Sequence, residues 1–493
     1  MQIGSILRSN TLRRLSDYSP PEADARLRTS LKHILLEGVP ADIVLRIFGT
    51  FTTPLALALR ATVPQIGLLT AVPYALGAVA QLMTHNLVGI AGSRRRFFLV
   101  VIVLGAFIWL PIALLPWVFG AGKVWWLLGF VTLAFALFQL PAPAWGSWVA
   151  QLVPANRLGR FVGARATLAT VVGVLTMLAL GRFLDIMHNY LFLGFSLVFF
   201  GALLSRLVSV YFIARVHEPP IPKRGSPSPG LWASLRSLAR SDLGHFTGIN
   251  AFFHFCVNIA GPFFNVLMLR DLGFSYTTLT LLQLVTVASG LVGLQVLGPL
   301  ADRIGNVRVM RMSIPLIAAG CLAWLFNQTP LYLIGVEVVM GFAWAGYNLG
   351  SLNFALEASS EEERTKLVGY FHFAAGIGIA LGAVTGGFLA TRLPVLLPYR
   401  LLTLIMLSGV LRLGVGLLLM AFVHDVRQDA ETPRLARFRV PHLRFASPGF
   451  TGLLSQAKIG WSRCDSKIIR HRKGPWPGGS LEPARQDLKG EEK

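Results

Sequence analysis

Charged residues, and acidic ones above all, are scarce in this chain. Only 14% of its 493 residues are charged, and 23 Asp and Glu residues stand against 45 Lys and Arg residues. Soluble domains carry about 25% charged residues, whereas this chain is 54% hydrophobic with a mean hydropathy of +0.60. The composition therefore excludes an ordinary soluble protein and places the chain in a lipid bilayer.

Cysteine is also scarce, and several catalytic signatures are missing. The three cysteines, Cys256, Cys321 and Cys464, lack metal-ligand spacing, and the first two fall within predicted helices, so we expect packing roles and no bound metal or cofactor. No G-x-x-x-x-G-K-[ST] phosphate loop occurs, which argues against direct use of ATP. Neither His-Glu-x-x-His nor a nucleophile and base constellation is present, so the sequence does not predict an intramembrane enzyme.

Long apolar runs are abundant. A helix needs about 20 apolar residues to cross the hydrocarbon, because it satisfies its own backbone groups there. The sequence predicts an all-α membrane protein with twelve such segments, near 38–59, 65–90, 97–118, 124–148, 162–182, 189–213, 245–269, 276–300, 311–328, 331–355, 366–390 and 400–423.

The placement of the basic residues supports this count. Lys and Arg concentrate in alternate loops, such as 94–96, 157–165, 215–240 and 303–311, as expected of cytoplasmic loops. Twelve helices with both termini in the cytoplasm fit the alternation. The net charge of +22 is explained by attraction to the anionic inner leaflet, and no nucleic-acid partner is needed. The first 33 residues lack the apolar core of a cleaved signal.

The two halves of the chain look duplicated. Ser205-Arg206-Leu207 is echoed by Leu411-Arg412-Leu413, and Val216-His217-Glu218 by Val423-His424-Asp425, about 206 positions later. Parallel repeats of six helices are a transporter architecture with a site at the repeat interface. We expect Arg206 and Arg412, at matching positions, to pack rather than to bind solute.

A proline-rich and basic stretch separates the halves and predicts a linker. The expected organisation is an N-terminal cytoplasmic segment (1–37), a six-helix bundle (38–213), a cytoplasmic linker (214–244), a second six-helix bundle (245–423) and a basic cytoplasmic tail (424–493).

A short charged turn gives the strongest local signal. Residues 298–308 read Gly-Pro-Leu-Ala-Asp-Arg-Ile-Gly-Asn-Val-Arg, between two apolar runs. Together with the 6+6 helix pattern, this turn resembles the major facilitator superfamily, whose loops after helices two and eight carry G-x-L-x-D-R-x-G-R-R. Asn306 replaces a usual basic residue, and the first copy has decayed, with His85 and Gly89 at motif positions.

Other residues resemble a bacterial branch of the superfamily whose substrate is unsettled. They are Glu37, the run 65–69, Pro73, Trp145-Gly-Ser-Trp148 and Gln151-Leu-Val-Pro154. The resemblance implies a monomeric integral protein of the bacterial inner membrane. It also implies a gating loop, in which Asp302 caps a helix end and pairs with basic residues while Gly305 permits the turn. That loop is formed by Gly298, Asp302, Arg303, Gly305 and Arg308. The alternative is that Asp302, Arg303 and Arg308 only determine topology.

The resemblance further implies that helices one, four, seven and ten line a central cavity. Helix seven offers Asn250, His254 and Asn258 at intervals of four, and His254 is either a proton-linked contact or a neutral packing residue. Helix ten offers Glu337, Trp344 and Asn348 on one face. Glu337 is the first candidate proton carrier, with a structural carboxylate near the outer mouth as the alternative.

Helices one and four offer weaker signals. Asp42 and Arg46 lie four residues apart and could form an inner gate, grip a charged solute or simply anchor the helix. Gln139 is the candidate from helix four.

These observations predict a secondary active transporter of a small solute, working by alternating access and coupled to protons. Export of an amphipathic or cationic compound is favoured over uptake. The alternative is a sensor or scaffold of the same fold that transports nothing and acts through its cytoplasmic tail.

Overall fold

Twelve long helical segments make up the part of the chain that the structure describes. The computed structural model describes residues 25–219, 242–357 and 364–422, and within these ranges it contains helices and turns but no strand. The first half comprises α2 (Ala25–Ala58), α3 (Val63–Ala91), α4 (Arg94–Val118), α5 (Lys123–Gln139), α6 (Ala142–Leu152), α7 (Ala155–Ile186), η3 (His188–Tyr190) and α8 (Leu191–Ile213). The second comprises α10 (Asp242–Ala260), α11 (Phe263–Val266), η4 (Leu267–Asp271), α12 (Tyr276–Ile304), α13 (Asn306–Ala323), α14 (Pro330–Glu357), α15 (Arg364–Arg392) and α16 (Arg400–Phe422).

Local sequence explains where several helices begin and end. Ser93 and Ser275 cap α4 and α12, since their hydroxyls accept hydrogen bonds from the N–H of Arg96 and Thr278. Gly92 and Gly305 occupy positive φ angles of 62° and 93° at the turns after α3 and α12. A residue with a Cβ is strained there, so glycine permits both tight turns.

Most helices extend beyond the apolar runs that predicted them. α2 begins at Ala25, inside the range expected as a cytoplasmic segment, and α7 runs from Ala155 rather than from about 162. Polar residues outside the apolar core can continue a helix as readily as apolar ones. The expected tail, most of the linker and the first 24 residues lie outside the described ranges.

One predicted span is broken in the middle. α5 and α6 together occupy 123–152, and the helix breaks at Leu140-Pro141 because proline cannot donate the helical hydrogen bond. The hydroxyl of Thr84 on α3 donates to the carbonyl of Leu140 at 2.5 Å. A neighbouring helix thus supplies a donor to the backbone at the break.

Ten of the twelve segments in the described ranges are long and apolar enough to cross a membrane by length and composition. α2 and α13 complete the set, but both carry charged residues: α2 contains Asp42 and Arg46, and α13 contains Arg308 and Arg311. These charges lower the mean hydropathy of the two helices, whose lengths of 34 and 18 residues still reach the minimum of about 17 residues for a membrane span.

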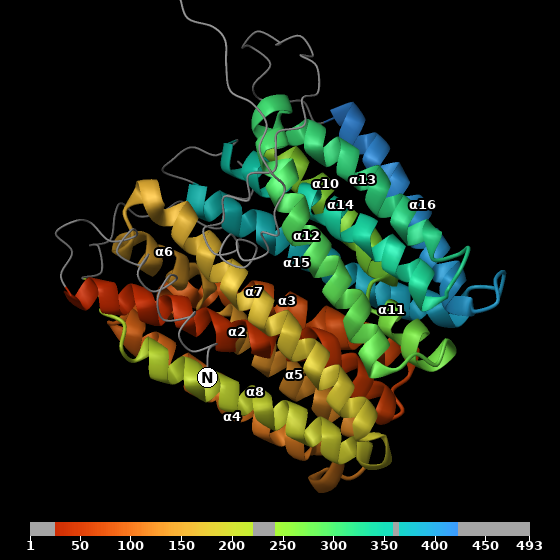
Figure 1. Cartoon of the computed structure of the whole chain (residues 1–493), viewed down its shortest axis with the longest axis horizontal. Coiled ribbons are helices and arrows are strands. Elements are labelled where there is room, and N and C mark those ends of the chain that lie inside the picture. The colour runs from red at the N-terminus through yellow and green to blue at the C-terminus, as the bar shows by residue number, and fades with distance from the viewer. Residues whose placement is uncertain (1–24, 220–241, 358–363, 423–493) are drawn as a thin grey trace, which may run out of the picture. The chain divides into compact units, whose positions relative to one another are not determined.

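The two halves repeat the same pattern of helix packing. In the first half α2 packs on α7, α3 on α5 and α4 on α8; in the second, α10 packs on α15, α12 on α14 and α13 on α16. Each set joins the first helix to the fifth, the second to the fourth and the third to the sixth. The architecture is therefore two six-helix bundles related as a repeat, coloured red to yellow and green to blue in Figure 1.

Glycines allow the helices of the second bundle to approach closely. Gly378, Gly382 and Gly386 follow one another at intervals of four on α15, so they share a face. A Cβ at any of them would lie 2.0–2.3 Å from a carbonyl oxygen of α10. Small residues at this spacing are a common way for membrane helices to bring their backbones together.

The bundles contact each other along two seams. One joins α3 to α15, where a Cβ at Gly67 would lie 2.5 Å from the carbonyl oxygen of Ala383. The other joins α7 to α12, where a Cβ at Gly181 would lie 2.8 Å from the carbonyl oxygen of Tyr276. Both seams need glycine, because backbone atoms cannot move aside as a flexible side chain can.

Candidate functional site

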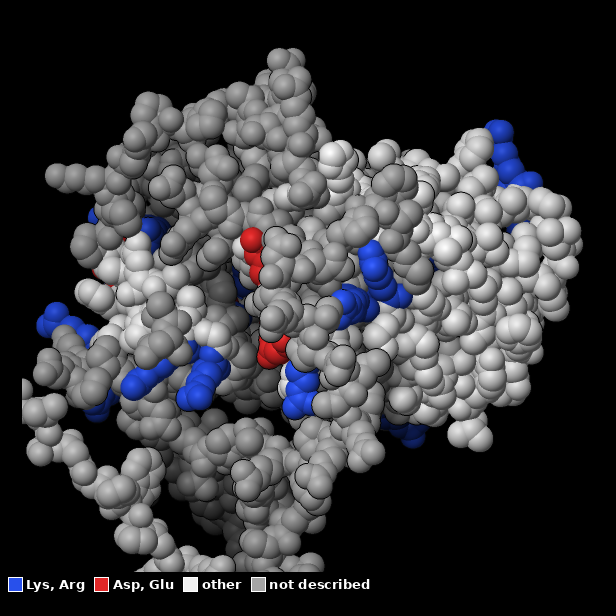
Figure 2. All heavy atoms as spheres, turned by 90° about the horizontal axis from the view of Figure 1, so that it is seen from above, with Lys and Arg blue, Asp and Glu red and all other residues white. Residues whose placement is uncertain are grey.

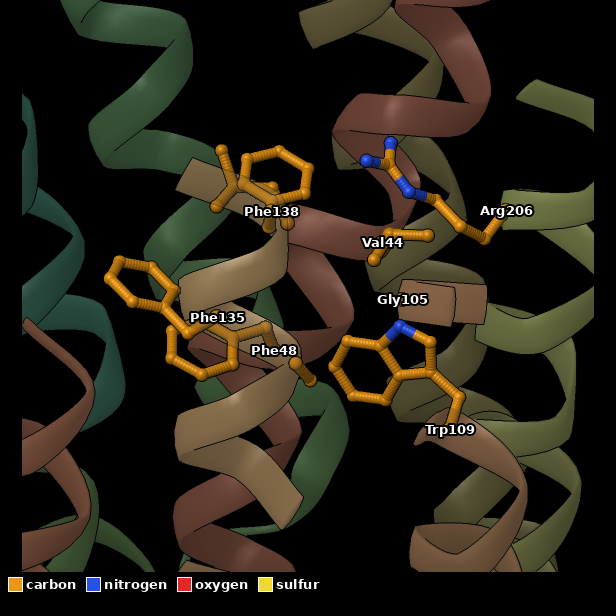
Figure 3. Close-up of a pocket in the computed structure, with 9 residues that line it drawn as sticks. Val44, Phe48, Gly105, Trp109, Phe135, Phe138 and Arg206 are labelled. Carbon is orange, nitrogen blue, oxygen red and sulfur yellow. The ribbon is translucent and has the colours of Figure 1, made fainter. Parts of the chain in front are cut away.

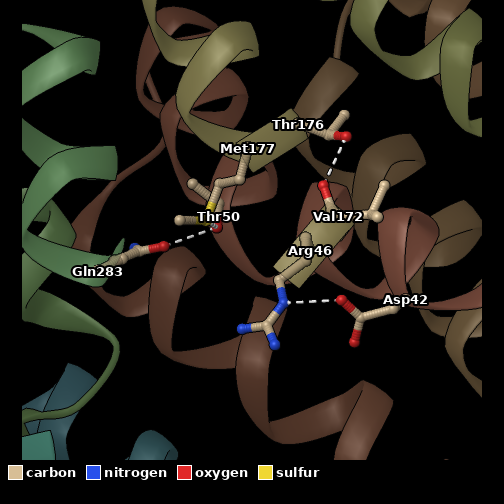
Figure 4. A network of polar contacts seen from close by, with 7 residues as sticks. All are labelled: Asp42, Arg46, Thr50, Val172, Thr176, Met177 and Gln283. Carbon is tan, nitrogen blue, oxygen red and sulfur yellow. Dashed lines mark hydrogen bonds and ion pairs between the residues drawn. The ribbon is translucent and has the colours of Figure 1, made fainter. Parts of the chain in front are cut away.

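A polar network lies where α2, α7 and α12 meet (Figure 4). The hydroxyl of Thr50 on α2 donates to Oε1 of Gln283 on α12 at 2.7 Å and lies 3.1 Å from the sulfur of Met177 on α7. Since α2 and α7 belong to the first bundle and α12 to the second, this contact joins the two halves in the middle of the fold.

The predicted pair Asp42 and Arg46 adjoins this network. Arg46 Nε donates to Asp42 Oδ2 at 3.1 Å, and the side chains are 25% and 15% exposed. Asp42 lies against α7, because a Cβ at Gly173 would fall 2.0 Å from Asp42 Oδ2. The pair is therefore wedged inside the first bundle, with the guanidinium one helical turn from Thr50. The sequence did not single out Gln283 or Met177 as partners.

An aromatic cluster joins α10 to α14. The Tyr347 hydroxyl donates to Asn250 Oδ1 at 2.5 Å, and Asn250 is only 2% exposed. The Tyr347 ring lies 4.4 Å from that of Phe253, 5.8 Å from that of Trp344 and 6.2 Å from that of His254. The predicted faces of α10 and α14 thus meet through Tyr347, which was not predicted from the sequence.

Glu337 lies elsewhere on α14. Its carboxylate accepts a hydrogen bond from the Thr286 hydroxyl of α12 at 2.5 Å, and the side chain is half-buried. Seven residues separate it from Trp344, so it lies about two turns, near 10 Å, along the helix from the aromatic cluster. Within the described residues no hydrogen bond joins Glu337 to His254, and the two proposed proton groups are separate.

The remaining predicted residues are more peripheral. Asn258 donates to the carbonyl of His254 on its own helix at 2.9 Å. Asn348 is exposed, and Gln139 packs beside Gly77 of α3, where a Cβ would lie 3.3 Å from its Cγ. None of the three shares a hydrogen bond with the Thr50 network in the described part of the chain.

The predicted gating loop forms the tight turn between α12 and α13. Asp302, Arg303 and Arg308 are exposed, and none of them forms an ion pair with a residue in 25–219, 242–357 or 364–422. Gly298 is half-buried one and a half turns before the end of α12. The unusual Asn306 is buried instead: its amide donates to Glu357 at 3.0 Å and accepts from Asn353 at 3.1 Å, both on α14.

A buried ion pair was not predicted from the sequence. Arg165 on α7 donates to Glu37 on α2 at 2.7 Å and to the carbonyl of Ile34 at 3.1 Å, and its guanidinium lies 4.5 Å from the ring of Trp145. Gly38 leaves room for this arginine, because a Cβ there would lie 2.9 Å from its Cγ. The only indication of this ion pair in the sequence was the position of Glu37 within an otherwise apolar run.

Two further carboxylates cap helices. Glu218 accepts from the Arg94 backbone N–H at 2.5 Å and from the Ser93 hydroxyl at 2.6 Å, at the start of α4. Asp185, at the end of α7, accepts from the backbone N–H groups of Tyr276 and Thr277 at the start of α12, each at 2.8 Å. A carboxylate is stabilised at a helix N-terminus by unpaired N–H groups and the helix dipole.

The matching arginines Arg206 and Arg412 are buried and contact other side chains and backbone. Arg206 lies 5.1 Å above the ring of Phe138 and lines a cavity of about 10 Å³ with Val44 and Trp109 (Figure 3). Such a volume holds a water molecule at most. Arg412 donates to the carbonyl of Val257 at 3.1 Å.

A larger apolar groove of about 510 Å³ runs between α10 and α15, lined by Thr247, Phe252, Phe255, Tyr370, Phe373 and Leu381. On the face seen in Figure 2, blue Lys and Arg side chains outnumber red Asp and Glu side chains among the described residues. In residues 25–219, 242–357 and 364–422, no three His, Cys, Asp or Glu side chains are grouped to hold a metal.

A family model described as the Major Facilitator Superfamily matches residues 246–463, which include α11 to α16 and most of α10. By sequence, the second half of the chain thus matches the superfamily. A search of curated proteins found no match.

Solved transporter structures superpose on this chain over most of its length. The nucleoside transporter NupG gives a TM-score of 0.63 at 14% identity, covering 80% of this chain and 98% of that chain. A D-xylose-proton symporter gives 0.62 at 14%, covering 81% and 98%. A bacterial homolog to the human lysosomal transporter Spinster, inward-facing and unoccupied, gives 0.57 at 19%, covering 81% and 96%. At these identities the likeness shows the fold alone.

The family match to the second half and the ten described helices of spanning length indicate an integral membrane protein. The seams α3–α15 and α7–α12 join the second and fifth helices of one bundle to the fifth and second of the other. The polar network around Thr50 lies beside the second seam, on the first helix of the first bundle.

Proposed function

We propose that the chain is a secondary active transporter that carries a small solute by alternating access, with its binding site at the Asp42, Arg46, Thr50 and Gln283 network. The observation that carries this proposal is the 2.7 Å hydrogen bond from Thr50 to Gln283. It places polar groups of both bundles in contact beside a half-buried ion pair. A solute bound there touches both moving parts.

The chemistry of the network suggests what the solute presents. Arg46 uses Nε toward Asp42, and Gln283 uses its oxygen toward Thr50. The remaining groups, Arg46 Nη1 and Nη2 and Gln283 Nε2, are donors. Because the charges of Asp42 and Arg46 offset each other, the site favours acceptor oxygens or nitrogens more than a net charge. The aromatic cluster around Trp344 suits an apolar portion, so we propose an amphipathic solute.

Proton coupling is part of the proposal. Glu337 and His254 are ionisable side chains within membrane-spanning helices, where such groups commonly mark ion pathways. One structural relative is named a D-xylose-proton symporter, which supports proton drive as a general mode for this fold. We further propose that the basic loops and both termini face the bacterial cytoplasm.

The first test is a thermal-shift screen of the purified full-length protein against metabolites and drugs. A compound at 100 times its dissociation constant stabilises the folded state by about 2.7 kcal/mol. We expect a hit whose shift is lost in Arg46→Gln, followed by flux of that compound in proteoliposomes. If hits survive Arg46→Gln and Gln283→Leu, the site lies elsewhere; if none gives flux, a sensor or scaffold role through the tail replaces transport.

Coupling is tested with the identified solute. Glu337→Gln keeps the hydrogen-bonding shape beside Thr286 but cannot release a proton. We expect flux driven by a pH gradient to fall to the level seen without a gradient, while exchange of labelled for unlabelled solute continues. Val339→Ala, an exposed position on the same helix, is the control. Gradient-driven flux that is unchanged in Glu337→Gln would move the coupling site away from this carboxylate.

A further inference from the structure

The end of α7 is tied to the start of α12 by a single carboxylate. Asp185 accepts from the backbone N–H of Tyr276 and of Thr277 at 2.8 Å each, and also from the Thr277 hydroxyl. α7 belongs to the first bundle and α12 to the second. Asp185 therefore makes hydrogen bonds from one bundle directly to the backbone of the other.

These bonds satisfy donors that α12 cannot satisfy itself. The first N–H groups of a helix have no partner within it. Ser275 accepts from the third of them, Thr278, at 3.0 Å, whereas Asp185 takes the first two, Tyr276 and Thr277. The cap of α12 is thus shared between its own residue and a residue of the opposite bundle. Separating the bundles here strips two N–H groups of their acceptor.

The packing around Asp185 is tight. A Cβ at Gly181, one turn before Asp185, would lie 2.3 Å from the Thr280 hydroxyl and 2.8 Å from the Tyr276 carbonyl oxygen. The rings of Phe195 on α8 and Tyr276 meet edge to face at 5.8 Å, and Thr280 is fully buried. The seam is closed at this end of the helices, which is opposite to the end that carries Arg157.

We propose that Asp185 is a latch that holds the two bundles together at this end and must release each time the binding site opens there. The inference rests on the proposed alternating access. During alternating access the Asp185 carboxylate stabilises only the closed state, because its hydrogen bonds to Tyr276 and Thr277 break when α12 moves away. Asp185 is a positioning residue and touches no solute.

The latch is tested by labelling a cysteine at the central network. The reporter is Gln283→Cys in the full-length chain with Cys464→Ser, since Cys256 and Cys321 are buried. A membrane-impermeant charged maleimide is applied to vesicles from the side of Asp185. We expect slow labelling of the reporter alone and labelling about tenfold faster after Asp185→Ala, because the closed state loses its hydrogen bonds to a charged group; tenfold corresponds to about 1.4 kcal/mol.

Asp271→Ala is the matched control. Like Asp185, Asp271 lies where a membrane span ends, on the same side of the protein. Its partner is the adjacent Arg270, at 2.7 Å, so its loss breaks no bond between the bundles. Its labelling rate should equal that of the reporter alone. An equal rate in Asp185→Ala, or the same increase in Asp271→Ala, overturns the latch.

Two measurements keep the result interpretable. Thr277→Val removes one of the three donors while leaving Asp185 and both backbone bonds, so we expect a smaller increase, about threefold. This variant decides the question if Asp185→Ala does not give a monodisperse protein. Labelling does not require solute transport. A protein that labels as expected but transports no solute would therefore contradict the transport proposal and still support the latch.

Discussion

At the residue scale, the buried charges are those whose partners come from another helix. Glu37 and Arg165 have side chains only 6% and 19% exposed, and they meet at 2.7 Å between α2 and α7. Ionised groups taken out of water persist when they are paired and make further contacts: Arg165 also donates to the Ile34 carbonyl and lies over the ring of Trp145. The pair holds the first and fifth helices of the bundle at a fixed register.

We therefore expect Glu37→Ala to lower the free energy of unfolding by about 3 kcal/mol, since it leaves Arg165 buried without its carboxylate. Thermal unfolding of the purified protein in detergent would show this as a lower Tm. Arg270→Ala breaks the ion pair with Asp271 at a side chain that is 47% exposed, and it should change stability by less than about 1 kcal/mol. Equal Tm shifts for both variants would contradict the buried-pair argument.

In the first bundle, Glu218 also contacts residues far away in the sequence. Its two contacts to the start of α4 resemble an N-cap supplied from a distant part of the chain. The Trp148 indole also donates to the carbonyl of His217 at 3.1 Å, so this short segment joins α4, α6 and α8. The Val-His-Glu echo noted in the sequence thus has a structural role in its first copy.

At the element scale, glycines determine which helices meet. α15 carries Gly378, Gly382 and Gly386 against α10, and Gly387 against Pro64 of α3. One helix therefore has two glycine faces, one within its bundle and one across the seam. The mechanism we propose requires the second face to separate and the first to stay closed.

Substitutions test this difference. Gly67→Ala should destabilise the closed seam, because its Cβ would lie 2.5 Å from the Ala383 carbonyl oxygen. Gly414→Ala, where a Cβ meets nothing within 4 Å, should stabilise α16 by about 0.5–1 kcal/mol through its higher helix propensity. We expect opposite shifts of Tm in the two variants. A rise in both would mean that the α3–α15 seam tolerates a methyl group.

At the scale of the whole molecule, charge distribution and fold agree. Arg303 and Arg308 lie at one end of α12 and α13, while Arg60 and Asp185 lie at the other end of their helices. The excess of positive residues at one end predicts that this end faces the cytoplasm.

Introduced cysteines check the orientation in cells. With Cys464→Ser as background, Arg60→Cys should react with an impermeant maleimide added outside, and Arg303→Cys only after the membrane is permeabilised. Both positions are exposed, so burial does not confound the readout. The reverse pattern would invert the topology, and reaction at both positions from outside would contradict the odd number of spans, seven, that the structure places between them.

The fold followed from local properties that the sequence displays directly. Apolar length predicts each span because the bilayer thickness is fixed, and the alternation of basic loops predicts how many spans there are. The turn at Gly305 could also be predicted locally, because a positive φ angle strongly favours glycine. The family match and the helical architecture confirm this part of the interpretation.

Side-chain partners across helices were decided only by the tertiary structure. Glu337 and His254 were grouped from the sequence because both are ionisable and intramembrane, but about two turns of α14 separate Glu337 from the cluster around His254. Thr50 shares a helix face with Asp42 and Arg46, but Gln283 and Asp185 carry no distinctive local pattern, and their significance depends on residues 233 and about 91 positions away. Helix spacing fixes which residues share a face, whereas the rotation and register of packed helices fix what that face meets.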